Sequence, residues 1–363
     1  MKKFYLICLL LFCTYAAHAG MPADTTQARK KLSLTPFPAF FITPENGVGF
    51  GGLVIPVYNF GTDEYTRNST GQVLAYYTTK KQASLQLTYN IFTNRERFVL
   101  SGEAKYFDAP IFYYGIGNKN ELSDSSLISY KFLTFQNRLL KQVIKFVFIG
   151  GQFQVNRIRD VSFKNPDSKM KERPLDERDG SMIVGVGPAL LVDNRDNPLN
   201  TRQGFYAELG VFLNAKAMGS EFNFTRYNLD LRRFIPLSDK QVLAFQGVGK
   251  FSAGRVPFRD MANLGGDRIM RGFYDGRFRD RQMVALQAEF RQHLFSRIGL
   301  VAFGSLGQVS ERMDNFEMDN LKRAIGGGLR LMLNRQQRLN IRIDYAIGSD
   351  EASGLYFAIG EAF

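Results

Sequence analysis

Hydrophobic and polar residues alternate along most of the chain, in segments of about ten residues separated by short polar stretches. Between residues 338 and 348 nearly every second residue is apolar, and the opposite positions include Arg342 and Asp344. Residues 283–294 repeat this pattern, with Gln292 as the one exception. Because successive side chains of a β-strand point to opposite faces, the alternation predicts strands with one apolar and one polar face.

Sixteen such strands are predicted. They are expected near residues 36–43, 48–58, 70–79, 83–91, 97–107, 127–139, 142–155, 182–193, 204–214, 221–234, 241–252, 282–294, 298–309, 322–333, 338–348 and 354–363. The three longest connections, 108–126, 156–181 and 253–281, all follow odd-numbered strands, whereas most connections after even-numbered strands are short. Short periplasmic turns and long external loops are typical of bacterial outer-membrane barrels. The sequence therefore predicts an all-β fold, a transmembrane antiparallel barrel with both termini in the periplasm.

The amino terminus predicts a secretory signal peptide over residues 1–19. Two lysines precede an apolar stretch, and Ala17-His18-Ala19 matches a small-residue cleavage site. We expect residues 20–35 to form a short periplasmic lead and 36–363 to form the barrel. No later run of about 18 apolar residues exists, so a helical membrane protein is excluded.

Few residues remain for catalysis after the signal peptide. Both cysteines lie within it, and His293 is the one histidine outside it. This excludes thiol nucleophiles, disulfide scaffolds and zinc sites built on cysteine or several histidines. A Ser-His-Asp hydrolase would have to use His293, which is better interpreted as a polar residue of the wall. We expect no enzyme activity, no metal and no cofactor.

Charge and aromatic content fit a protein of the outer membrane of a Gram-negative bacterium. The formal net charge of +13 suits contact with lipopolysaccharide phosphates, and nucleic acid is not an expected partner of an exported protein. Phe and Tyr can supply interfacial aromatic girdles, although Trp is absent. The last segment, GLYFAIGEAF, places Phe357, Ile359 and Phe363 on one lipid-facing side together with Glu361. It resembles the terminal strand signal by which outer-membrane barrels are recognised for assembly.

Residues 263–276, NLGGDRIMRGFYDG, contain the triplet Arg271, Gly272 and Phe273. The segment resembles the signature loop of the BamA/TamA superfamily (the bacterial surface antigen family), whose members are outer-membrane assembly and translocation barrels. Here the loop joins the eleventh and twelfth predicted strands, so it is the sixth external loop, where the family carries its motif. The resemblance implies that Arg271 enters the barrel and contacts a carboxylate of the wall.

Two other segments carry the resemblance. The strand QMVALQAEFRQHLF is similar to a family strand with an inward acid, here Glu289, which is the candidate partner of Arg271. Residues 193–211 resemble the family's Asp-x-Arg-Asp turn and the strand after it. The matching residues of this turn are Asp193, Arg195, Asp196 and Gly204. Taken alone, its charges indicate a network that stabilises the turn rather than an acid–base pair.

Two departures from the family alter the expectations. Ser305 stands where the family often has a second inward acid, so we expect Arg271 to lack one of two partners. Only residues 20–35 separate the predicted signal peptide from the first strand, so we expect neither periplasmic substrate-binding modules nor an esterase domain.

The resemblance implies a factor that helps to insert or export proteins or lipids at the outer membrane, with a seam between the first and last strands that opens laterally. Pro36 and Pro38 would weaken backbone pairing at that seam. Expected partners are membrane lipid and lipopolysaccharide, with client outer-membrane proteins or a separate periplasmic partner left open. A passive or loop-plugged pore for small solutes fits the polar lumen equally well, and a barrel-embedded hydrolase ranks third.

Overall fold

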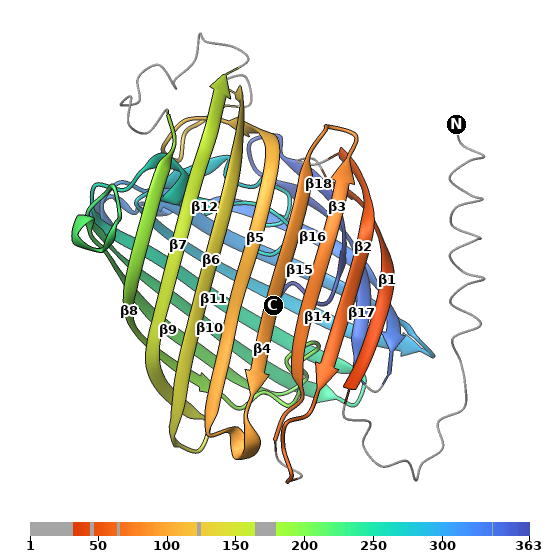
Figure 1. Ribbon diagram of the computed structural model, residues 1–363. Helices are drawn as coiled ribbons and strands as arrows, with labels where there is room; N and C mark the ends of the chain where they lie inside the picture. Colours follow the sequence, from red (N-terminus) through yellow and green to blue (C-terminus); the bar gives the residue numbers. More distant parts are fainter. Residues whose placement is uncertain (1–31, 44–46, 64–65, 122–124, 164–178, 336) are drawn as a thin grey trace.

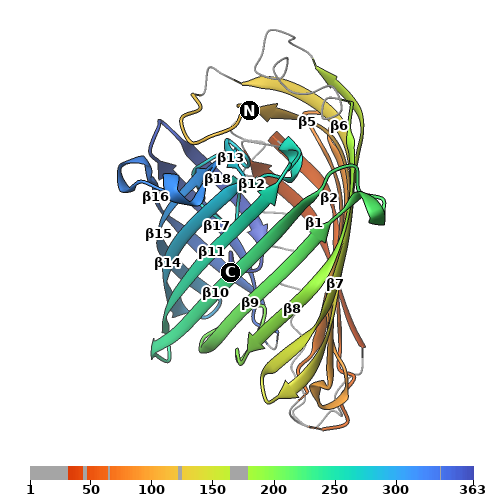
Figure 2. The same ribbon diagram turned by 90° about the vertical axis from the view of Figure 1, so that its left-hand side faces the viewer.

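The computed structural model describes residues 32–43, 47–63, 66–121, 125–163, 179–335 and 337–363. Within these residues 16 strands form one antiparallel sheet, and each strand pairs with the next in chain order. The sheet curls into a barrel (Figures 1 and 2). The predicted all-β fold is thus confirmed. The predicted signal peptide, 1–19, lies outside the described residues.

The strands of the main sheet carry the labels of Figure 1. They are β1 (Leu32–Thr43), β2 (Gly47–Tyr58), β3 (Ser69–Thr78), β4 (Ala83–Phe92), β5 (Phe98–Tyr113), β6 (Ser126–Ile144), β7 (Val147–Phe163), β8 (Ser181–Asp193), β9 (Gly204–Asn214), β10 (Phe224–Ser238), β11 (Gln241–Gly254), β14 (Gln282–Phe295), β15 (Ile298–Ser310), β16 (Lys322–Asn334), β17 (Leu339–Gly348) and β18 (Ser353–Ile359). Two short strands, β12 (Ala262–Leu264) and β13 (Phe278–Asp280), pair with each other. Short 3-10 turns are η1 (Asn94–Glu96), η3 (Lys216–Met218), η4 (Phe258–Asp260), η5 (Met313–Asn315) and η6 (Met318–Asn320).

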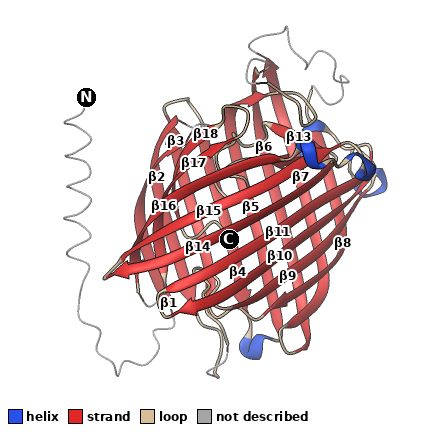
Figure 3. Ribbon diagram, turned by 180° about the vertical axis from the view of Figure 1, so that it is seen from behind, coloured by secondary structure: helices blue, strands red, loops and turns tan. Residues whose placement is uncertain are grey.

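Most strands begin and end close to the predicted positions. β1 begins at Leu32 rather than at residue 36, because Leu32 and Leu34 continue the alternation and β2 extends to Tyr58 as their pairing partner. β5, β6 and β7 are longer than predicted, with 16, 19 and 17 residues. No helix in the described part of the chain is long and apolar enough to cross a membrane, and Figure 3 shows the helical turns only between strands.

The alternation sets the two faces of the wall as predicted. On β14, the side chain of Leu286 is 62% exposed on the outside, whereas the neighbouring inward Glu289 is fully buried. The same contrast recurs around the barrel, as with outward Leu85 and inward Gln154. Apolar side chains therefore cover the outside and polar side chains line the lumen. We call the end of the barrel with the connection 255–281 the loop end, and the opposite end, where β1 begins and β18 ends, the turn end.

The first and last strands meet without a backbone ladder. β1 and β18 lie side by side, but among the described strands β1 pairs with β2 alone and β18 with β17 alone. Near the turn end an apolar cluster spans this seam. It contains Leu53, Ile55, Val57, Leu339 and Ile359. Side-chain packing, rather than continuous main-chain hydrogen bonding, therefore joins the two edges.

The carboxyl terminus turns into the lumen. β18 ends at Ile359, and Gly360 adopts a φ of +87°, a left-handed conformation that glycine tolerates best. Glu361 then accepts a hydrogen bond from lumenal Arg330 (2.7 Å), and Phe363 packs against Phe234 of β10. The chain end lies within the outline of the barrel in all three views (Figures 1–3).

This turn corrects the prediction for the last segment. Phe363 does not share a lipid-facing side with Phe357 and Ile359 of β18, because the strand stops four residues before the end of the sequence. Phe363 is only 7% exposed, and Glu361 faces the lumen rather than the lipid. The alternating pattern continues past Ile359 in the sequence, but the left-handed Gly360 ends the strand.

Candidate functional site

The connection between β11 and β14, residues 255–281, folds into the barrel. Its β12–β13 pair and the residues between them bury Leu264, Met270 and Phe273 completely. These side chains pack with Met283 of β14 and Val309 of β15 in one apolar cluster. The connection, which we call the inner loop, therefore has a core of its own that is built against the wall.

Arg271 of the inner loop inserts between two carboxylates of the wall. Its Nη1 donates a hydrogen bond to Asp344 Oδ2 of β17 at 2.7 Å, and its Nη2 donates one to Glu289 Oε1 of β14. The guanidinium carbon lies 3.5 Å from the centroid of the Phe303 ring. Charge-assisted hydrogen bonds of this kind are among the strongest in proteins. The structure thus brings Arg271 together with Glu289, and adds Asp344.

Asp344 corrects the expectation that Arg271 lacks a second partner. Ser305 stands where the family acid was expected, and its buried Oγ has no hydrogen-bond partner among the described residues. The second carboxylate comes instead from β17. The alternation placed Asp344 on the polar face of its strand, but contained no signal for its contact with Arg271, because that contact depends on how the loop inserts.

Further ion pairs surround Arg271. The Arg271 cluster consists of Arg271, Arg291, Arg330, Arg342, Asp267, Glu289, Asp344 and Glu361. Arg330 bridges Asp344 (2.6 Å) and Glu361 (2.7 Å), and so connects the loop anchor to the inward-turned carboxyl terminus. The four arginines face four carboxylates. Buried charges are tolerated when each has a partner in this way.

The next two residues of the triplet hold the loop against the last strands. Gly272 has a φ of +112°, and a Cβ on it would lie 3.4 Å from the carbonyl carbon of Ile347 in β17. Its N–H donates to the hydroxyl of Tyr356 in β18 (3.0 Å), and this hydroxyl donates to the carbonyl oxygen of Phe273 (3.2 Å). The triplet therefore contacts β17 and β18, the two strands on one side of the seam.

Replacing Tyr356 with phenylalanine is expected to lower the free energy of unfolding by about 1–3 kcal/mol, because the buried N–H of Gly272 loses its acceptor. Denaturant unfolding of the barrel in detergent measures the change. Tyr227→Phe is the matched control, since Tyr227 is 45% exposed on the outer face. Equal stability of the two variants would contradict a stabilising role of the Tyr356 hydroxyl between Gly272 and Phe273.

A second group of charged residues lies at the turn end. The carboxylate of Asp193, where β8 ends, accepts hydrogen bonds from Arg195 and from Arg67 of the β2–β3 connection. Arg67 also pairs with Glu96 of the β4–β5 connection at 2.8 Å, and its guanidinium lies 4.3 Å from the centre of the Phe92 ring. Arg67 therefore joins three connections that are far apart in the sequence.

The β8–β9 connection reaches other turns as well. Asp196 accepts a hydrogen bond from Arg338 of the β16–β17 connection, and Arg202 donates to the carbonyl oxygen of Ser238 (3.1 Å) at the end of β10. Gly204, where the connection ends, has a φ of +122°, and a Cβ there would lie 2.8 Å from the carbonyl oxygen of Asn194. We call residues 193–204 the mouth segment, because it ties turns from different parts of the barrel together.

The sequence indicated only a local network in the mouth segment. The structure does place Asp193 against Arg195. The distant partners Arg67 and Arg338 carried no signal in the sequence, because they belong to other turns and approach only when the barrel forms.

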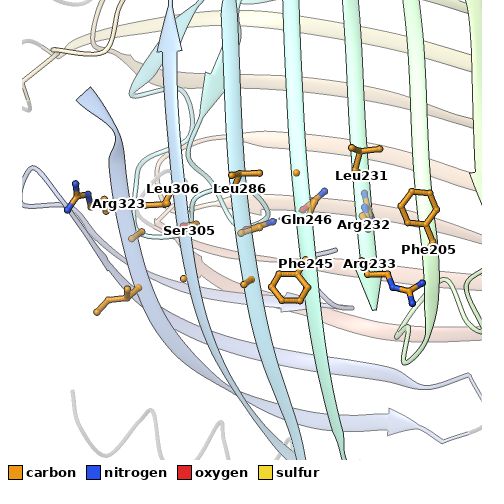
Figure 4. A pocket seen from close by; sticks show the side chains of 16 residues that line it. Phe205, Leu231, Arg232, Arg233, Phe245, Gln246, Leu286, Ser305, Leu306 and Arg323 are labelled. Atoms are coloured by element: carbon orange, nitrogen blue, oxygen red, sulfur yellow. Dashed lines mark hydrogen bonds between the residues drawn. The ribbon is translucent and has the colours of Figure 1, made fainter. Parts of the chain in front are cut away.

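A cavity and a surface hollow complete the description. A lumenal cavity of about 490 Å³ lies between the inner loop and the wall formed by β5–β11. On the outer face, a shallow hollow of about 720 Å³ is lined by apolar side chains such as Leu231, Phe245 and Leu286, with Arg233 and Arg323 at its sides (Figure 4). Such an apolar surface suits contact with lipid chains.

Comparisons with known proteins agree with this architecture. A family model described as the Omp85 superfamily domain matches residues 58–363. No curated protein sequence matches the chain. Solved structures with a similar fold include BamA from Haemophilus ducreyi lacking POTRA domains 1–3, with 14% identity, a TM-score of 0.57, and coverage of 94% of this chain and 74% of that chain.

Two further structures have the same fold. CdiB from Acinetobacter baumannii is 12% identical with a TM-score of 0.59, over 92% of this chain and 60% of that chain. CdiB from Escherichia coli is 10% identical with a TM-score of 0.59, over 93% of this chain and 63% of that chain. The chain thus spans less than two thirds of either CdiB protein, and the likeness at these identities is one of fold.

Proposed function

Because the chain belongs to the Omp85 superfamily, we propose that it is an outer-membrane barrel that helps to insert or export proteins or lipids. In this proposal the loop end faces the outside of the cell and the turn end faces the periplasm, as in bacterial barrels with long external loops. The proposal includes no catalytic step.

The seam is the observation that carries the proposal. Closing a barrel with a complete ladder leaves no free strand edge, whereas β1 and β18 lie side by side with no ladder between them in the described residues. Separating them therefore requires the loss of side-chain packing such as that of Ile55 and Leu339, and no complete ladder has to be broken. An edge that opens in this way can pair with an incoming strand or admit a lipid.

The inner loop has a bracing role in this proposal. Arg271 binds β14 and β17, and Gly272 and Phe273 are held by Tyr356 of β18. The loop thus fixes the side of the seam formed by the last strands, while β1 and β2 have no partner in the triplet among the described residues. Movement at the seam is then expected on the β1 side.

The partners in the proposal are outer-membrane lipid and lipopolysaccharide, together with client outer-membrane proteins or a separate periplasmic protein. The test is depletion of the protein, followed by quantitative profiling of outer-membrane proteins and lipids. Selective loss of certain barrels, surface lipoproteins or lipids, restored by a plasmid copy, is the expected result. An unchanged envelope would count against insertion and export.

A passive or loop-plugged pore is the second candidate, and the lumenal cavity favours it. Conductance of the purified barrel in planar bilayers separates the two functions. A steady open conductance together with an unchanged envelope after depletion would establish the pore. A closed barrel together with selective losses would establish the insertion or export role.

A further inference from the structure

The lumenal cavity carries an excess of positive charge. Eight arginine and lysine side chains line it, against five aspartate and glutamate side chains. They come from both walls of the cavity: strands β5, β6, β9, β10 and β11 on one side and the inner loop on the other. The cavity volume of about 490 Å³ falls within the range of sites that hold small ligands.

The acids of this cavity already have partners. Glu208 pairs with Arg138 at 2.5 Å, Asp230 pairs with Arg232 at 2.6 Å, and Glu103 pairs with Lys105 at 2.6 Å. The remaining two, Asp260 and Asp275, accept hydrogen bonds from asparagine side chains, and Asp260 also lies 3.7 Å from Arg226. The five carboxylates therefore cannot neutralise all eight cations of the cavity.

Four cations line the cavity without an ion pair to any described residue. They are Lys250, Arg259, Arg268 and Arg279. Lys250 stands on β11 and the other three belong to the inner loop. The side chains of Lys250 and Arg268 also have no hydrogen-bond partner in the described part of the chain. Their charged ends are available to a ligand.

The other two cations are held in position by uncharged groups. Arg279 is 2% exposed, and its Nε donates to the carbonyl oxygen of Gly276 at 3.2 Å. Arg259 lies over the rings of Tyr130 and Phe132, at 5.0 and 5.3 Å from their centroids. Burial, together with the charge of Arg259, lowers the pKa of Arg279. Carbonyls and rings orient these guanidinium groups but do not neutralise them.

We propose that the lumenal cavity binds a small phosphate-bearing anion between Lys250 of the wall and Arg259 and Arg268 of the inner loop. A polyvalent oxyanion fits better than a monovalent one, because several uncompensated cations converge on one cavity. Guanidinium groups present paired donors that match phosphate oxygens, and lysine adds a compact charge. The anion would also connect the inner loop to β11, on the side of the loop away from the seam.

The experiment measures binding of inorganic pyrophosphate to the full chain in neutral detergent, by calorimetry at constant ionic strength. Saturable binding with one site per chain is expected, and acetate at the same ionic strength is expected to show none. Lys250→Gln and Arg268→Gln are each expected to weaken binding about tenfold, which corresponds to about 1.4 kcal/mol. Arg268 is an exposed side chain, so its variant tests the site without disturbing the packing of the loop.

Arg312→Gln is the matched control, because Arg312 pairs with Asp314 on an exposed connection outside the cavity. Its affinity for pyrophosphate is expected to equal that of the parent. Absence of saturable binding, equal binding of acetate, or equal weakening by Arg312→Gln would each overturn the proposal.

A second arm identifies the source of the phosphate group. The chain is placed in nanodiscs of phosphatidylcholine alone or with added phosphatidylglycerol, and pyrophosphate binding is measured again. Weaker pyrophosphate binding in the discs with phosphatidylglycerol supports the site and shows that lipid headgroups reach it. Unchanged binding supports the site and assigns it to a free solute.

Discussion

Replacing Arg271 with alanine is expected to lower the free energy of unfolding of the barrel by about 3 kcal/mol, near the lower end of the range for breaking a buried ion pair. Glu289 and Asp344 are both fully buried and would lose a shared partner. The loss is moderated because Arg291 still pairs with Glu289 and Arg330 with Asp344. Denaturant unfolding in detergent, followed by circular dichroism, measures it.

Lysine at position 271 provides the sharper comparison. It keeps the positive charge but cannot contact two carboxylates with a planar fork, so a stability between those of the parent and the alanine variant is expected. Arg312→Ala, on an exposed connection, is the control and should change stability little. If Arg271→Ala were as stable as Arg312→Ala, the ion pairs of Arg271 with Glu289 and Asp344 would not stabilise the barrel.

The same variant separates two roles of the inner loop. If the loop braces the wall, Arg271→Ala impairs assembly of the barrel or the handling of its clients. If the loop acts only as a plug, the variant raises conductance and leaves barrel assembly and client handling unchanged. A variant that changes none of folding, conductance or clients would refute both roles.

Replacing Arg67 with alanine is expected to open the turn end of the barrel and raise its conductance in planar bilayers. Arg67 is the residue that joins Asp193 of the mouth segment to Glu96. Without it, the buried carboxylate of Glu96 loses its cation while Asp193 keeps Arg195, so the β4–β5 connection is no longer tied to the mouth segment. A stability loss of about 3 kcal/mol is expected as well, since a buried charge pair is broken from one side.

Lys131→Ala is the matched control for Arg67. Lys131 also forms an ion pair, with Asp160 at 2.7 Å, but both side chains are largely exposed. Its removal should alter neither conductance nor stability measurably. If Arg67→Ala conducts no more than Lys131→Ala, the mouth segment does not close the barrel.

The strands were predictable from the sequence because apolar outward residues and polar inward residues alternate along each strand of a membrane barrel. Leu286 and Glu289 differ in hydropathy and lie on opposite sides of the same strand, so neither tertiary contacts nor relatives were needed to place them. The inward direction of Glu289, and with it a candidate partner for Arg271, followed from the same rule.

Contacts made across the lumen were not predictable. Asp344 lies on the polar face of β17, but the alternation does not show which inward carboxylates of the wall reach Arg271. Arg67 and Asp193 are 126 positions apart and meet only once the turns converge. The end of β18 was missed for a different reason: a glycine with positive φ stops a strand without altering the alternation around it.

The inward course of the last residues has a practical consequence for handling the protein. A peptide fused after Phe363 would begin inside the barrel, beside Phe234 and Arg291, where an affinity resin or antibody has no access. It would also displace Glu361 from Arg330 on its way out. The β15–β16 connection, where Met318 is 78% exposed, is the better insertion point for a purification tag or a displayed epitope.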